Sequence, residues 1–232
     1  MLFGGLQKNT LIDFPAKIAC VFFASGCNFD CPYCHNPELA KGTVISDEVF
    51  DENRAYDFLE KRKGFLDGVV ISGGEPTLQP DVAAVCRTIR QMGYPVKIDT
   101  NGSRPQVLKQ LIDQELIDYI AMDIKADPAE YPPVIAKNIP PENILESIRL
   151  IMDSGLDYEF KTTCVRPLVD AGVVEAICRT IHGARRYALQ EFQNTGVLHP
   201  EFFIAHPVQY SKNDLEKFQA IARPWVKECL VR

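Results

Sequence analysis

Three cysteines lie close together near the amino terminus and could hold a metal cluster. Cys27, Cys31 and Cys34 are spaced C-x-x-x-C-x-x-C, and Tyr33 directly precedes the last of them. Thiolates are soft ligands that hold iron–sulfur clusters, and an electron-transfer [4Fe–4S] centre has a thiolate on each iron. With only three thiolates, the fourth iron is open to a small molecule, and an open position makes a metal site reactive. The spacing therefore predicts a reactive cluster.

Two other interpretations compete with the cluster. Cys31-Pro32-Tyr33-Cys34 matches the dithiol loop of glutaredoxins. The three cysteines could also bind zinc with His35 as the fourth ligand, but adjacent Cys34 and His35 would crowd one tetrahedron. Cys27, the length of the chain and the polar clusters described below all favour the cluster over the dithiol.

Composition restricts the class of protein. The chain has 232 residues, 46% hydrophobic and 24% charged, which fits one globular domain spanning 1–232. The net charge is −6 and no Lys/Arg-rich run occurs, so we expect no nucleic-acid partner. No apolar run approaches the ~18 residues of a membrane span, so we expect no membrane partner.

The cysteine content bears on the cellular compartment. The first residues lack the charged leader and apolar core of a signal peptide, which predicts a cytoplasmic protein. Thiols stay reduced in the cytoplasm, so the eight cysteines are interpreted as a metal or redox set before a disulfide framework. Outside the triad they are scattered singly, which predicts a single cluster. Cys86 and Cys178 lie on apolar helix faces and Cys20 and Cys164 in strands, as small core residues do.

The elements that must position the triad alternate along the chain. Six apolar runs of strand length occur at residues 17–24, 68–71, 95–98, 119–124, 158–165 and 187–192. Helical patterns follow them at 46–63 (with Ser46 as cap), 80–92, 103–114, 142–154, 170–181 and after Ser211. This alternation predicts an α/β fold with a parallel sheet and outer helices. Eight units would close a barrel, so six suggest an open, partial (β/α)6 barrel of the TIM type.

Small, polar or charged residues recur where the predicted strands end. After the cysteine segment they are Gly73-Gly74-Glu75, Asp99-Thr100, Asp123 with Lys125, Arg166 and His206. The carboxyl ends of parallel strands converge on one face, so we expect these clusters to meet there. Taken singly, each has a plainer interpretation: a strand–helix turn at the glycines, a salt-bridge network at the acids, a core histidine at 206.

These motifs together carry a resemblance. The cysteine segment followed by Gly73-Gly74-Glu75-Pro76 resembles the radical S-adenosylmethionine (SAM) superfamily. Asp13-Phe14-Pro15 and the run from Gly26 to Leu39 are similar to the longer form of the activating proteins of anaerobic ribonucleoside-triphosphate reductase. Asp99–Gly102 and Asp123–Lys125 resemble strand ends of the pyruvate formate-lyase activating enzyme. Ala16 departs from the pattern, since glycine is expected after the Asp-aromatic-Pro turn.

The resemblance implies roles for residues of this chain. Cys27, Cys31 and Cys34 would ligate three irons of a [4Fe–4S] cluster, and SAM would chelate the fourth. Tyr33 would lie beside the adenine, Gly73 and Gly74 would let the backbone approach the methionine part, and Glu75 would buttress that loop. The methionine carboxylate, with an optional monovalent cation, would be surrounded by Asp99, Thr100, Asp123 and Lys125. The ribose would be contacted by His206, and Arg166 would belong to the same group.

The resemblance also implies a function. The reduced cluster would cleave SAM to a 5′-deoxyadenosyl radical, which would take a hydrogen from a glycine of a partner enzyme. We expect anaerobic ribonucleotide reductase as that glycyl radical enzyme, and a flavodoxin- or ferredoxin-type electron donor. Two alternatives stay open: a small-molecule radical SAM enzyme of the deazapurine synthase type, and a non-catalytic dithiol or electron-transfer protein.

Overall fold

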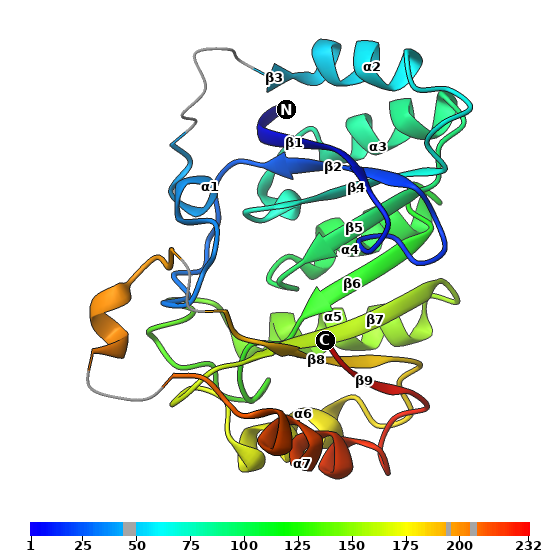
Figure 1. Ribbon diagram of the computed structural model, residues 1–232. Helices are drawn as coiled ribbons and strands as arrows, with labels where there is room; N and C mark the ends of the chain where they lie inside the picture. Colours follow the sequence, from blue (N-terminus) through cyan, green and yellow to red (C-terminus); the bar gives the residue numbers. More distant parts are fainter. Residues whose placement is uncertain (44–49, 194–195, 205–207) are drawn as a thin grey trace. The chain divides into compact units, whose positions relative to one another are not determined.

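A computed structural model describes residues 1–43, 50–193, 196–204 and 208–232. It is an α/β structure with a mostly parallel sheet (Figure 1), whose hydrogen-bonded strand order is β3-β1-β2-β4-β5-β6-β7-β8-β9. The strands are β1 (Leu2–Thr10), β2 (Ala19–Ala24), β3 (Phe50–Asp51), β4 (Gly68–Gly73), β5 (Val96–Thr100), β6 (Tyr119–Asp123), β7 (Asp157–Cys164), β8 (Tyr187–Glu191) and β9 (Cys229–Val231). The helices are α1 (Pro37–Lys41), α2 (Glu52–Glu60), α3 (Val82–Gln91), α4 (Pro105–Asp113), α5 (Pro141–Asp153), α6 (Ala171–Thr180) and α7 (Lys212–Ala222), with 3-10 turns η1 (Pro76–Leu78) and η2 (Pro200–Phe203).

The chain divides into two compact units. The first comprises residues 1–28, 38–100 and 106–120, and the second comprises 29–37, 101–105 and 121–232. The expectation of one domain over 1–232 stays a prediction. Within the described residues, no helix is both long and apolar enough to cross a membrane.

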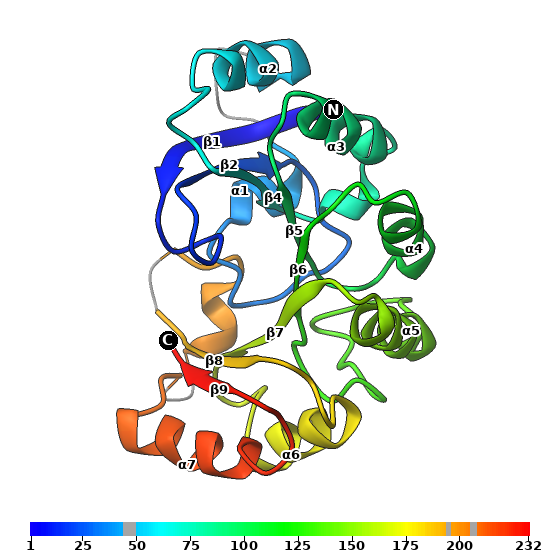
Figure 2. The same ribbon diagram turned by 90° about the vertical axis from the view of Figure 1, so that its right-hand side faces the viewer.

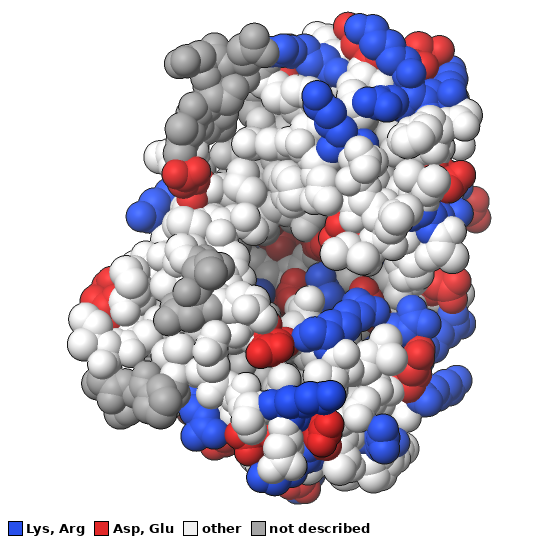
Figure 3. All heavy atoms as spheres, in the orientation of Figure 1, with Lys and Arg blue, Asp and Glu red and all other residues white. Residues whose placement is uncertain are grey.

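In the first unit, β2, β4 and β5 pair in parallel, and β1 pairs antiparallel with both β2 and β3. Helices α3 and α4 lie side by side along one face of these strands (Figure 2). Aromatic side chains of β1, β2 and β3 pack together. The ring centroid of Phe3 is 5.1 Å from that of Phe22 and 5.9 Å from that of Phe50. Over α2, basic and acidic side chains are interspersed (Figure 3), and Lys63 pairs with Glu60 at 2.8 Å.

In the second unit, β7, β8 and β9 pair in parallel. Helix α6 begins where the Asp170 carboxylate accepts the Val173 N–H at 2.9 Å. Helix α7 begins with a capping box, in which Ser211 and Asp214 each accept a backbone N–H of the other. Such caps satisfy donors that the first turn of a helix leaves without partners, which explains why both helices start where the sequence predicts.

The sequence predicts most of these elements correctly. All six predicted strands are present, as β2 and β4 to β8. Three strands of the described residues were not predicted. The apolar pattern of β1 is interrupted by Gly4 and Gly5, and β3 and β9 are very short. The prediction that a helix starts at Ser46 falls outside the described residues. Helix α2 itself begins at Glu52, where the Asp51 carboxylate accepts the Arg54 N–H at 3.0 Å.

Candidate functional site

The cysteine segment begins directly after β2, where the chain turns at Gly26 with a positive φ of 91°. The Gly26 N–H donates to the Leu39 carbonyl at 2.7 Å, and the Cys27 N–H donates to the Ala40 carbonyl at 3.1 Å. Both acceptors belong to α1. The first cysteine is therefore positioned by two backbone hydrogen bonds to a helix that follows the segment in sequence.

The other two cysteines lie in the second unit, in a loop held by its own contacts. The Cys34 N–H donates to the Cys31 carbonyl at 3.0 Å, which closes a turn between them. The loop is fixed to η2 by His199, whose N–H donates to the Pro32 carbonyl at 3.1 Å and whose Nε2 lies 2.8 Å from Asp30 Oδ1. We did not foresee His199 from the sequence, because nothing local links it to the cysteines.

The donor set fits an iron–sulfur cluster. Cys31 is 6% exposed, and Cys27 and Cys34 are half-buried thiols. No three His, Cys, Asp or Glu side chains in the described part of the chain are arranged to hold a metal ion, so the fit rests on the chemistry of the three sulfur donors and not on their geometry. A short loop of three soft sulfur donors matches the thiolate ligation of iron–sulfur clusters.

Of the remaining cysteines, Cys20, Cys86, Cys164 and Cys178 are buried core residues, whereas Cys229 is half-buried. Burial raises the pKa of Cys20, Cys86, Cys164 and Cys178 to about 12 and that of Cys229 to about 11. Metal binding requires the thiolate, so these protonated thiols are poor ligands. This agrees with the expectation for the buried cysteines.

Gly73, the last residue of β4, and Gly74 pack against the backbone that leads to Cys27. The Gly74 N–H donates to the Ala24 carbonyl at 2.9 Å, and the Glu75 N–H donates to the Gly26 carbonyl at 2.8 Å. A Cβ on Gly74 would lie 2.1 Å from the Gly26 oxygen, and one on Gly73 would lie 2.5 Å from the Ala24 nitrogen. Glycine is therefore required here for close packing of two strand ends, a reason that the sequence did not reveal.

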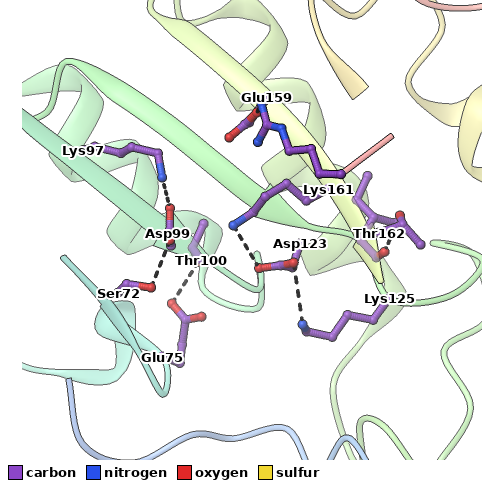
Figure 4. Close-up of polar contacts among 12 residues, drawn as sticks. Ser72, Glu75, Lys97, Asp99, Thr100, Asp123, Lys125, Glu159, Lys161 and Thr162 are labelled. Atoms are coloured by element: carbon purple, nitrogen blue, oxygen red, sulfur yellow. Dashed lines mark hydrogen bonds and ion pairs between the residues drawn. The ribbon is translucent and has the colours of Figure 1, made fainter. Parts of the chain in front are cut away.

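Glu75 is fully buried and ties the end of β4 to the end of β5. Its Oε1 accepts the Thr77 N–H at 3.0 Å. The same oxygen accepts the Thr100 hydroxyl at 2.8 Å (Figure 4). Hydrogen bonds to a charged acceptor compensate for burying the carboxylate. This contact joins two strand ends and engages the hydroxyl of Thr100, and the role of Glu75 in the SAM loop stays a prediction.

Asp99 lies between two side chains of its own unit (Figure 4). Its Oδ2 accepts the Ser72 hydroxyl at 2.9 Å, and its Oδ1 forms an ion pair with Lys97. Lys97 is 2% exposed, and its ammonium lies 5.9 Å from the ring centroid of Tyr119. Sequence analysis missed Lys97, although it stands two residues before Asp99, so both side chains point to the same face of β5.

Asp123 lies between two lysines of the second unit. Its Oδ2 is 3.6 Å from the Lys161 ammonium and its Oδ1 is 3.9 Å from that of Lys125 (Figure 4). The Lys125 N–H donates to the Tyr131 hydroxyl at 2.9 Å. Lys161, on the neighbouring part of β7, was not foreseen.

Tyr33 is close to this group. The Lys125 ammonium lies 6.0 Å from the centroid of its ring. Its hydroxyl is buried and has no hydrogen-bond partner among the described residues, and burial raises the pKa of Tyr33 well above its usual value. A buried polar atom without a partner beside the cysteine loop is compatible with a bound cofactor.

Arg166 is engaged with α7. Its guanidinium lies 4.2 Å from the ring centroid of Tyr210 and 3.6 Å from the carboxylate of Asp214. These contacts give Arg166 a structural role, and its predicted role towards the ribose stays a prediction. His206 lies outside the described residues.

The comparison with protein families decides the class of this site. Residues 21–177 match the model of the radical SAM superfamily. The chain belongs to this superfamily. It is a radical SAM enzyme whose cofactors are SAM and a [4Fe–4S] cluster on three cysteines, as the resemblance implied.

Its relatives include activating enzymes. The radical SAM chain is 35% identical to a Methanocaldococcus jannaschii protein assigned as a glycyl-radical enzyme activating enzyme, over 100% of this chain and 95% of the relative. It is 36% identical to the pyruvate formate-lyase-activating enzyme of Listeria monocytogenes over 125 residues, 49% of each chain. It therefore belongs with the glycyl-radical enzyme activating enzymes.

A solved structure supports the fold alone. QueE from Escherichia coli has a TM-score of 0.56 to this chain at 14% identity, and the similarity covers 100% of this chain and 93% of that chain. The similarity in fold extends along the whole chain, and it agrees with the predicted α/β fold of the partial-barrel type.

Proposed function

We propose that this radical SAM enzyme generates a glycyl radical on anaerobic ribonucleoside-triphosphate reductase. The observation that carries the proposal is 35% identity to an assigned activating enzyme along the whole chain. The motif run from Asp13 to Pro15 and from Gly26 to Leu39 supports this particular partner. A flavodoxin- or ferredoxin-type protein would supply the electron, and the reduced thiols suit a cytoplasmic location.

The cluster would be held by Cys27, Cys31 and Cys34. When bound, it supplies the electron that cleaves the sulfonium of SAM, and the hard chemistry is that of the cofactors. The protein would hold the reacting groups in place and exclude water. The hydrogen bonds of Cys27 to α1 and of Pro32 to His199 support this assignment, because they hold the backbone on both sides of Cys31.

The residues that we propose for SAM binding are held by contacts within their own units. In the first unit, Gly73, Gly74 and Glu75 would meet the methionine part, and the bond between Glu75 and Thr100 keeps that strand end in place. Asp99 would contribute there from β5.

In the second unit, the predicted contacts are Tyr33, Asp123 and Lys125, with Arg166 and His206 towards the ribose. The ammonium groups of Lys125 and Lys161 lie beside Asp123, and a nearby positive charge attracts an anion such as the carboxylate of a methionine. The buried hydroxyl of Tyr33 supports a ligand beside the loop.

The test is an anoxic activation assay. The reconstituted protein is reduced with dithionite and mixed with SAM and the reductase, and electron paramagnetic resonance is recorded. We expect a glycyl doublet on the reductase together with 5′-deoxyadenosine. A reductase in which the radical glycine is replaced by alanine is the control, and it should give no doublet.

Other outcomes identify the alternatives. A doublet on pyruvate formate-lyase but none on the reductase would replace the partner and keep the activating function. Cleavage of SAM that requires a soluble metabolite, with no radical on either protein, would favour a small-molecule enzyme of the deazapurine synthase type. If a protein with a verified cluster does not cleave SAM, the remaining alternative is a non-catalytic electron-transfer protein.

A further inference from the structure

A buried lysine–aspartate pair lies on β5. Lys97 and Asp99 are two residues apart on the same strand, and their side chains face each other. The Lys97 side chain is 3% exposed and that of Asp99 is 15% exposed. Asp99 is one of the residues beside which the family resemblance allows a monovalent cation.

Both oxygens of the Asp99 carboxylate are engaged. Oδ1 forms the ion pair with Lys97, and Oδ2 accepts the hydroxyl of Ser72 at 2.9 Å. The ring of Tyr119 lies 5.9 Å from the ammonium, which adds a cation–π contact on a second side of it. The ion pair of Lys97 and Asp99 is therefore surrounded by residues of the first unit, Ser72 beside the carboxylate and Tyr119 beside the ammonium.

Charge makes this ammonium and a metal ion mutually exclusive. A buried ammonium is costly unless it is paired, so Lys97 depends on Asp99. A sodium or potassium ion on the same carboxylate would place two cations within a few ångströms in a poorly solvated site, where like charges repel strongly. One carboxylate cannot neutralise both.

The second unit shows the same arrangement independently. Asp123, the other acid of the expected cation site, has the ammonium groups of Lys161 at 3.6 Å and Lys125 at 3.9 Å. Its charge is therefore also balanced by side chains of this chain.

We propose that the ammonium of Lys97 is the resident counter-cation of Asp99, and that this chain binds no monovalent metal ion there. The optional cation of the resemblance does not fit the residues present. The proposal rests on the proposed function only in giving Asp99 a place near SAM. It concerns the folded apoprotein, so it can be tested without cluster, SAM or partner.

The first experiment uses the wild-type apoprotein. Its thermal unfolding is measured in KCl, NaCl and choline chloride at equal ionic strength. A ligand that binds only the folded state raises the midpoint in a saturable manner. We expect superimposable midpoints in the three salts. A saturable rise with potassium or sodium, absent with choline, overturns the proposal.

The second experiment removes the ammonium. In Lys97→Met the carboxylate of Asp99 loses its ion pair with Lys97, so sodium or potassium should now raise the midpoint by at least about 2 °C over choline. The matched control Lys97→Met/Asp99→Asn removes both charges and should ignore the salt. The same salts are then compared in the affinity of the reconstituted proteins for SAM, where only Lys97→Met should respond.

The outcomes are distinct. If Lys97→Met folds but its midpoint responds to neither sodium nor potassium, the proposal is contradicted. It is also contradicted if Lys97→Met fails to fold in each of the three salts while the double variant folds. If neither variant folds, the wild-type titration decides. A failed glycyl radical assay changes none of these results, and a cation effect on the wild type leaves the activating function untouched.

Discussion

A Cβ atom on Gly74 would lie 2.1 Å from the carbonyl oxygen of Gly26. This relationship joins the end of β4 to the residue before Cys27. The adjoining Glu75 N–H donates to the same carbonyl at 2.8 Å. Two motifs separated by almost fifty residues in sequence are thus packed backbone against backbone, and a side chain at residue 74 would force them apart.

Gly74→Ala should therefore destabilise the apoprotein by about 1–3 kcal/mol, the usual cost of overpacking. Chemical denaturation gives the free energy of unfolding. The matched control is Gly5→Ala in β1, where a Cβ would meet only Phe23 at 3.4 Å. If both variants unfold at the same denaturant concentration, the close packing at residue 74 has no energetic weight.

Glu75→Ala should cost about 2–3 kcal/mol, because it removes the charged acceptor of hydrogen bonds from the buried Thr77 N–H and the buried Thr100 hydroxyl. Glu75→Gln keeps an acceptor at the same place and should cost about 1 kcal/mol or less. Urea denaturation of the apoproteins compares the two. Equal stabilities of the alanine and glutamine variants would show that these hydrogen bonds are unimportant.

Cys31→Ala should abolish both the cluster and the cleavage of SAM. Iron and acid-labile sulfide after anoxic reconstitution, with 5′-deoxyadenosine formation, measure the two. Cys86→Ala, which alters a buried thiol of α3 whose pKa is raised to about 12 by burial, should retain both. A Cys31→Ala protein that still cleaves SAM would falsify the ligand assignment.

Tyr33→Phe should leave the apoprotein as stable as the wild type or stabilise it by up to about 1 kcal/mol, because the buried hydroxyl has no partner among the described residues. Tyr131→Phe is the matched control. Its hydroxyl accepts the Lys125 N–H at 2.9 Å, so its loss should cost about 1 kcal/mol. The unfolding midpoints of the two variants are compared, and Tyr33→Phe should have the higher one. A Tyr33→Phe protein less stable than the wild type would contradict the prediction for the Tyr33 hydroxyl.

The contact between His199 and the cysteine loop should weaken as pH rises. The hydrogen bond to Asp30 raises the pKa of His199 above its usual 6.5. The stability that protonated His199 gains from Asp30 is fully present below the pKa of histidine in the unfolded state. It is lost as pH rises through the raised pKa of His199 in the folded state. Amide exchange of the His199 N–H in the apoprotein, corrected for the intrinsic rate, should show more protection at about pH 6 than at about pH 8.5. In Asp30→Asn the difference should shrink; an unchanged difference excludes this ion pair as its cause.

The sequence alone determined the parts of this protein that depend on local spacing. The triad Cys27, Cys31 and Cys34 can be recognised because its members lie within eight residues, and a cluster needs its sulfurs close together. The six predicted strands followed from apolar runs. Helices α6 and α7 followed from their caps, Asp170 and Ser211, because a cap acts within one turn.

The tertiary structure decided which residues from distant segments meet. Strand β1 is stabilised by Phe22 and Phe50 around Phe3, which a pattern broken by two glycines does not reveal. Gly74 has to be glycine because of Gly26, and Asp123 is balanced by Lys161. Sequence periodicity gives the face on which a side chain lies, but only the packing of strands gives its neighbour, and the neighbour determines the electrostatics of the site.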